Sequence, residues 1–136
     1  MTRANGGQGN VRALHRIRVA LVGRDPHFVK VAGFLLERHG FVLASTRRPG
    51  DALELVDRHR ANVVVIDASD SLEAAARAAA AVDALHPGVA VIVVADRVDR
   101  LPTSSLDVLP KWDVARLAGE IERAYNGKTQ VLRGAG

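Results

Sequence analysis

Short runs of β-branched and other apolar residues alternate along this chain with longer stretches of helical periodicity, and this order restricts the possible folds most. The runs lie at residues 17–22, 41–44, 63–66, 91–94 and 107–109. Repeated strand-then-helix units are typical of a parallel sheet that helices cover on both faces. With right-handed crossovers, the pattern predicts a flavodoxin-like, doubly wound α/β fold with a five-stranded parallel sheet of order 2-1-3-4-5.

The stretches between the runs carry helix signals. Asp25 followed by Pro26 predicts a helix start, and Gly40 predicts its stop. A second helix is expected to open at residues 49–51, and the Ala-rich stretch 71–86 has strong helix propensity. The expected buried face of the last helix consists of Val114, Leu117, Ala118, Ile121 and Tyr125.

A length of 136 residues fits one domain, which we expect to span residues 17–126. The excess of basic over acidic residues comes from the two ends of the chain. Residues 1–16 and 127–136 hold five of the 19 Lys and Arg residues and no acids, which leaves 14 bases against all 15 acids in residues 17–126. We therefore predict a disordered basic tail (1–16), a flexible tail (127–136) and no specific nucleic-acid binding.

Several classes of protein are disfavoured by what the sequence lacks. There is no cysteine, hence no disulfide and no thiolate metal site. No apolar run approaches the roughly 20 residues that cross a bilayer. No phosphate-binding glycine loop and no recognisable nucleophile–base pair is present. We therefore expect a cytoplasmic protein that is not an enzyme, contacts no membrane and needs no metal or cofactor.

In a doubly wound sheet, ligands lie at the carboxyl ends of the strands, so function should be sought there. The residues expected at these ends are Gly23, Arg24, Asp25, Asp67, Ala95, Asp96 and Lys111.

Three segments carry a resemblance to a known family, and it extends over residues 17–125. They read VALVGRDPHFVKVAGFLLERHGF, ANVVVIDAS and DVLPKWDVARLAGEI. Together they resemble the CheY-like receiver domain of bacterial two-component response regulators. The resemblance implies that Asp67 stands at the phosphoacceptor position and Lys111 at the position that pairs with the phosphoryl group. It also implies an Mg²⁺ ion held by the acceptor and an acidic pair after the first strand, because a hard cation neutralises the approaching anions.

The sequence departs from this pattern at most of the other site positions. Gly23 and Arg24 replace the acidic pair, and only Asp25 is an adjacent acid. Ala95 stands where the family has a hydroxyl, and Val108 stands where many members have the switch aromatic. The segment between Ala95 and Lys111 is several residues shorter than the family pattern, so the fourth helix of that fold, between the fourth and fifth strands, is expected to be short or missing.

These departures suggest a site that works without a metal ion. We hypothesise that Arg24 pairs with Asp67 in place of Mg²⁺, while Asp25 turns outward as a helix cap. The resemblance then implies an atypical receiver, a protein–protein interaction module of two-component or phosphorelay signalling that is not phosphorylated with Mg²⁺. It would act through a signalling protein, an output domain or a homodimer, and Trp112, at the start of the last helix, is a candidate interface residue.

Two alternatives remain open. In the first, Asp67 is a working phosphoacceptor. In the second, the strand-end crevice binds a small molecule, as cobalamin-binding domains of this fold do with an Asp-x-His-x-x-Gly motif; here His27 matches the histidine, but Lys30 replaces the glycine. The sequence does not identify the partner, the pathway or the oligomeric state.

Overall fold

The sheet has the predicted order. The computed structural model describes residues 16–97 and 108–135, and its five strands are parallel in the order β2-β1-β3-β4-β5. The strands are β1 (Arg18–Val22), β2 (Val42–Thr46), β3 (Val63–Asp67), β4 (Ala90–Ala95) and β5 (Val108–Pro110). The chain therefore places β1 and β3 centrally, with their neighbours β2 and β4 on either side.

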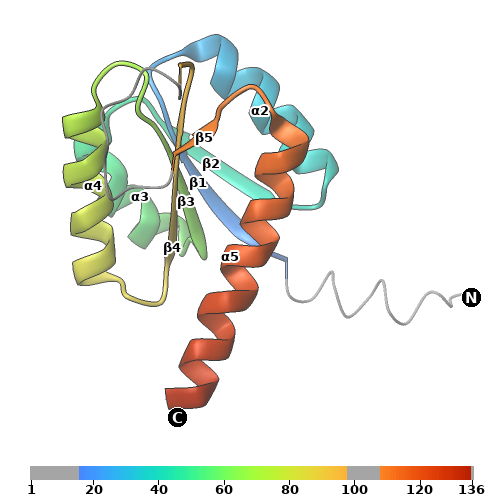
Figure 1. Cartoon of the computed structure of the whole chain (residues 1–136), viewed down its shortest axis with the longest axis vertical. Helices are drawn as coiled ribbons and strands as arrows, with labels where there is room; N and C mark the ends of the chain where they lie inside the picture. Colours follow the sequence, from blue (N-terminus) through green and yellow to red (C-terminus); the bar gives the residue numbers. More distant parts are fainter. Residues whose placement is uncertain (1–15, 98–107, 136) are drawn as a thin grey trace, which may run out of the picture.

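Helices cover both faces of the sheet. They are α2 (Pro26–Arg38), α3 (Ala52–His59), α4 (Leu72–Leu85) and α5 (Val114–Ala135), and a short 3₁₀ helix, η1 (Pro49–Asp51), leads into α3. As Figure 1 shows, α2 and α5 lie on one side of the sheet and α3 and α4 on the other. The result is the three-layered, doubly wound α/β fold that the alternation predicts.

The core is aliphatic and divided by the sheet into two clusters. Phe28 and Leu36 of α2 pack with Leu117 and Ile121 of α5 against one face. Val56 of α3 and the small side chains of α4 pack against the other face. Every residue of β3 from 63 to 66 is fully buried, because both faces of a central parallel strand are covered.

The ends of α2 follow from local chemistry. The side chain of Asp25 accepts hydrogen bonds from the backbone N–H groups of His27 and Phe28, and Pro26 occupies the first turn. After the helix, Gly40 has a φ of 97°, a left-handed conformation that glycine adopts without steric cost. The helix start at Asp25 and its stop at Gly40 are thus confirmed.

The last helix extends past the expected C-terminal boundary of the domain. The last helix does not end near residue 126 but continues through residues 127–135, part of the segment expected to be a flexible tail. Lys128, in this extension, donates a hydrogen bond to the carbonyl of Pro87, after α4, at 3.1 Å and approaches Asp83 of α4 at 3.8 Å.

Two other predictions lie outside the described residues. The expected disordered tail falls almost wholly on residues 1–15, and the connection expected to carry a short or missing helix falls on residues 98–107.

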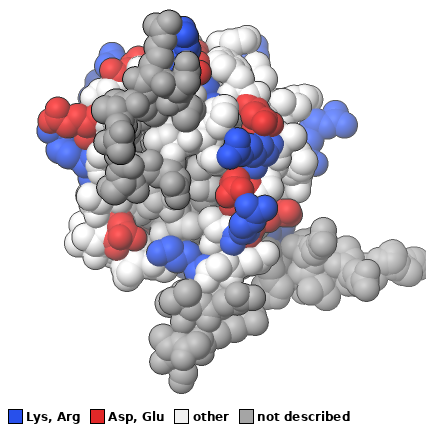
Figure 2. Space-filling model, viewed as in Figure 1, with Lys and Arg blue, Asp and Glu red and all other residues white. Residues whose placement is uncertain are grey.

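On the described part of the face drawn in Figure 2, charged residues form no large patch of one sign. Along α5, Lys and Arg alternate with Asp and Glu on this face.

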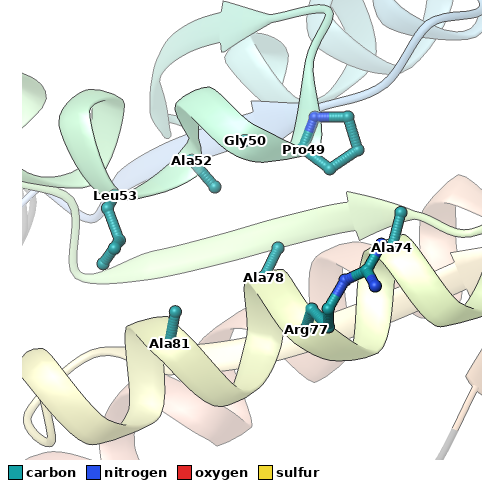
Figure 3. A pocket seen from close by; sticks show the side chains of 8 residues that line it. All are labelled: Pro49, Gly50, Ala52, Leu53, Ala74, Arg77, Ala78 and Ala81. Atoms are coloured by element: carbon teal, nitrogen blue, oxygen red, sulfur yellow. The ribbon is translucent and has the colours of Figure 1, made fainter.

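Between η1–α3 and α4 lies an apolar groove of about 260 Å³, in which Leu53 faces the small side chains of Ala78 and Ala81 (Figure 3). Within the part of the chain that is described, no helix is both long and apolar enough to cross a membrane.

Candidate functional site at the carboxyl ends of the strands

The parallel order of the strands brings the predicted site residues to one edge of the sheet. Asp67 is the last residue of β3, Ala95 ends the adjacent β4, and Lys111 directly follows β5. Gly23 follows β1, on the other side of β3. The backbone N–H of Lys111 also donates to the carbonyl of Ala95 at 3.1 Å, so the lysine is held beside the end of β4.

Lys111 points inward and lies at the centre of the site. Only 1% of its side chain is exposed, and its ammonium nitrogen is 2.8 Å from Asp67 Oδ2, 3.2 Å from Asp25 Oδ2 and 3.7 Å from Asp96 Oδ1. The ammonium also lies 5.0 Å from the centre of the Phe28 ring. Three carboxylates and an aromatic face thus surround one buried cation, which compensates for the loss of its hydration.

Both carboxylate oxygens of Asp67 are engaged, and its side chain is only 4% exposed. Oδ2 accepts from Lys111 at 2.8 Å, while Oδ1 accepts from the backbone N–H of Ser69 at 2.9 Å and from its hydroxyl at 2.6 Å. The Ser69 hydroxyl accepts in turn from the backbone N–H of Asp96 at 3.1 Å. Sequence reasoning missed Ser69, although a serine two residues after a strand-end aspartate is a common partner in such turns.

Asp25 has two roles at once. Its Oδ1 caps α2, and its Oδ2 faces the Lys111 ammonium. The hydrogen bond from Lys111, assisted by those of the two backbone N–H groups, lowers the pKa of the Asp25 carboxyl. The expectation that Asp25 caps the helix is confirmed, but the expectation that it turns outward is wrong, because the two oxygens of one carboxylate point to two different partners.

The electrostatics of Lys111 combine opposing effects. Burial alone would lower the pKa of its ammonium, but the hydrogen bond and charge of Asp67, with the contributions of Asp25 and Asp96, outweigh burial and raise it. Lys111 is therefore a permanent cation at neutral pH.

Trp112 closes the site on its outer side. Its indole N–H donates to Asp96 Oδ1 at 2.8 Å, and its ring meets the edge of Phe28, with centroids 5.6 Å apart and planes at 89°. The ring of His27 lies 5.5 Å away on the same side. Nevertheless, 46% of Trp112 remains exposed.

The fold is similar to that of solved receiver domains. A receiver domain protein from Clostridium thermocellum superposes with a TM-score of 0.70 at 17% identity, covering 85% of this chain and 98% of that one. A CheY-like receiver domain protein from Methanospirillum hungatei JF-1 gives 0.69 at 15% identity, covering 85% and 98%. An orphan response regulator of H. pylori gives 0.64 at 20% identity, covering 80% and 96%.

This chain has the receiver fold. The predicted resemblance is confirmed at the level of the fold, since the Clostridium and Methanospirillum domains each superpose on 85% of this chain and have the same type of parallel sheet. No family model matches the sequence, and no curated relative matches it.

Arg24 does not take the place that we predicted for it in this receiver fold. Its side chain is 70% exposed and approaches Asp70 at 3.5 Å, away from Asp67. The hypothesis that Arg24 pairs with Asp67 is therefore wrong. The physical reason is that Lys111 already occupies the buried position against Asp67, whereas an arginine at the surface keeps its charge hydrated.

The other departures from the receiver pattern are at Gly23, Ala95 and Val108, which lie at or near strand ends, as the sequence predicts. Gly23 is buried, and a Cβ atom added there would lie 3.2 Å from the Cβ of Asp67, which is closer than the packing readily accepts. Ala95 is buried at the end of β4, and Val108, at the start of β5, packs against the cluster under α3 and α4. None of these three side chains offers a ligand or a hydroxyl to the site.

The residues present do not fit the Mg²⁺ ion that the receiver fold implies. Within the described ranges, no group of three or more His, Cys, Asp or Glu residues is arranged to hold a metal ion. Instead, Asp67 Oδ2 and Asp25 Oδ2 are both directed at the Lys111 ammonium. The cation that these carboxylates face, and that offsets part of their charge, is the side chain of Lys111.

Proposed function

We propose that this protein is an atypical receiver module that acts in bacterial two-component or phosphorelay-type signalling through protein partners, without Mg²⁺-dependent phosphorylation. The observation that supports the proposal most directly is the position of Lys111, whose ammonium lies within 4 Å of Asp67, Asp25 and Asp96. An internal cation at this point balances part of the carboxylate charge that a metal ion would otherwise offset.

The chemistry of phosphoryl transfer explains why this arrangement opposes modification. An aspartate that attacks a phosphoryl donor must approach several anionic oxygens, and a metal ion normally spreads that charge. Here the Asp67 oxygens are occupied by Lys111 and Ser69, and the side chain is nearly fully buried. Attack would require these hydrogen bonds to break before any metal ion could assist.

The surface around Trp112 is the most suitable place for a partner. Its indole N–H is already satisfied by Asp96, so a partner need not supply an acceptor, and its exposed ring lies beside His27 at the start of α2. Exposed tryptophans that are held in one orientation are frequent anchors of protein interfaces. We infer that a signalling protein contacts this surface, formed by His27 and Trp112.

The experiment that tests the proposal is intact-mass spectrometry after incubation with acetyl phosphate and Mg²⁺. We expect no added phosphoryl group on the wild-type chain. Asp67→Asn, which keeps the shape of the side chain and one acceptor oxygen but removes the nucleophilic carboxylate, serves as the matched control. A mass increase of one phosphoryl group in the wild type that is absent in Asp67→Asn would overturn the proposal.

That outcome would favour the alternative in which Asp67 is a working phosphoacceptor. The 2.8 Å contact between Asp67 and Lys111 is compatible with it, because the same lysine would then stabilise the phosphoryl group. For cobalamin binding, His27 would have to leave its contact with Trp112, and no observation favours that change.

A further inference from the structure

Three arginines gather around a crevice beside the site. The crevice has a volume of about 490 Å³ and is lined by Arg24, Arg47, Arg48 and Pro49. It is formed by the segments that follow β1 and β2, two adjacent strands of the sheet. Three guanidinium groups around one crevice make it strongly cationic, which favours a counter-charge there.

The described part of the chain supplies little of that charge. Arg24 approaches Asp70 at 3.5 Å, and this pair is largely exposed. Arg47 and Arg48 make no ion pair with any described residue. The lining therefore carries three positive charges against one nearby carboxylate, and the remaining charge is available to an anion from solution.

A second crevice adjoins the first and shares Arg47 with it. It has a volume of about 240 Å³, and its lining adds Lys30, the hydroxyl residues Ser45 and Thr46, and the apolar side chains of Pro26 and Val29. The first crevice is thus strongly cationic, and the second, which also borders Arg47, combines a cation, hydroxyls and an apolar wall. That sequence of surfaces suits a molecule with phosphates at one end and a less polar body at the other.

We propose that this arginine crevice, defined by Arg24, Arg47 and Arg48, binds the di- or triphosphate group of a small phosphorylated ligand of the nucleotide class. Guanidinium groups bind phosphate oxygens in bidentate fashion, and several arginines match a polyphosphate better than a single phosphate. The body of the ligand extends past Arg47 into the second crevice. The inference does not depend on how Asp67 behaves, since none of its residues contacts Lys111.

Isothermal titration calorimetry with pyrophosphate and with ADP tests this proposal, at constant ionic strength and without divalent cations. We expect both probes to bind, ADP more tightly. The Arg47→Ala/Arg48→Ala variant should bind each at least about tenfold more weakly, since a charge-assisted hydrogen bond contributes about that factor. Arg116→Ala/Arg123→Ala, which removes two exposed arginines of α5, is the matched control and should bind as the wild type does.

Three results would overturn the proposal. Absence of pyrophosphate and ADP binding in the wild type would remove the site. Equal weakening by the control and the Arg47→Ala/Arg48→Ala variant would indicate diffuse attraction by net charge alone. Equal affinities for ADP and pyrophosphate would remove the role of the second crevice. Thermal unfolding of each variant separates loss of binding from loss of fold, and the phosphorylation assay of Asp67 is read independently.

Discussion

At the scale of single residues, the central feature is a lysine whose ammonium group is the counter-ion of the surrounding carboxylates. Lys111 is almost inaccessible to solvent, yet it remains charged because Asp67, Asp25 and Asp96 surround it. Its burial is tolerable only while these carboxylates are ionised. The acids in turn repel one another without the lysine, so each group depends on the others.

Replacing Lys111 by methionine keeps the volume of the side chain and removes its charge. Because Asp67 is then left buried without a cation, we expect Lys111→Met to lower the free energy of unfolding at neutral pH by about 3 kcal/mol. Chemical denaturation measures this change, and Lys30→Met, at an exposed lysine, is the control. A loss of unfolding free energy in Lys111→Met no larger than in the control would contradict the assigned role of Lys111.

Mg²⁺ should stabilise Lys111→Met more than the wild type, because the carboxylates then lack their internal cation.

The lowered pKa of Asp25 predicts an acid dependence of stability. A carboxyl whose pKa is lower in the folded state than in the unfolded state adds stability above its unfolded pKa and loses it as the pH falls through its folded pKa. Asp25→Asn keeps an oxygen for the cap of α2 but loses the charge. We therefore expect this substitution to destabilise the protein at pH 7 and to matter less below about pH 4. Equal effects at both pH values, measured by chemical denaturation, would refute the charge argument.

The sequence predicts part of this site and not the rest. Asp67 and Lys111 could be placed because each follows a strand, and parallel strands end at one edge of the sheet. The direction of Arg24 could not be predicted, because a residue in a loop has several rotamers and the choice depends on competing partners across the fold. Ser69 was missed for a similar reason, since its hydroxyl joins Asp67 to Asp96 only after β3 and β4 pair.

At the scale of elements, α4 is packed through small side chains. Ala75 and Ala79 are buried against the sheet, while Ala78 and Ala81 face the groove toward Leu53 of α3 (Figure 3). Alanine allows the helix to approach the sheet closely and has the highest helix propensity. It also leaves the neighbouring groove only partly filled.

Filling that groove should stabilise the pair of helices. We expect Ala78→Leu to raise the free energy of unfolding by about 0.5 to 1 kcal/mol, because added apolar atoms replace water in contact with Leu53. Ala80→Leu, on the exposed side of the same helix, is the matched control. It changes helix propensity equally but leaves the new leucine side chain in water. Thermal or chemical unfolding compares the two; equal stabilities would mean that the groove does not accept the side chain.

The limits of α5 show what a local pattern misses. Its buried face was predicted correctly from residues 114–125, because apolar periodicity marks contact with the sheet. The apolar stripe ends at Tyr125, and residues 126–130 (NGKTQ) offer no apolar side chain that would extend it, so periodicity does not predict the rest of the helix. The continuation to Ala135 is accompanied by the contacts of Lys128 with Asp83 and Pro87, which a one-dimensional pattern does not contain.

At the scale of the whole molecule, the fold could be predicted almost completely. Fully apolar central strands alternate with amphipathic helices, and handedness and short connections leave few ways to assemble them. The same sheet then fixes the neighbours of each strand end. Fold and site therefore differ in predictability because the fold depends on averaged patterns, whereas the site depends on individual side-chain directions.

Lys111 also has a consequence for how a cell could use such a protein. Its position near Asp67, Asp25 and Asp96 is part of the folded chain and forms whenever the chain folds. Under the proposed function, no kinase, phosphatase or fluctuation in free magnesium would set the signalling state. What remains adjustable is the number of copies and the occupancy of the arginine crevice, so synthesis, degradation and ligand concentration, rather than covalent modification, would carry the information.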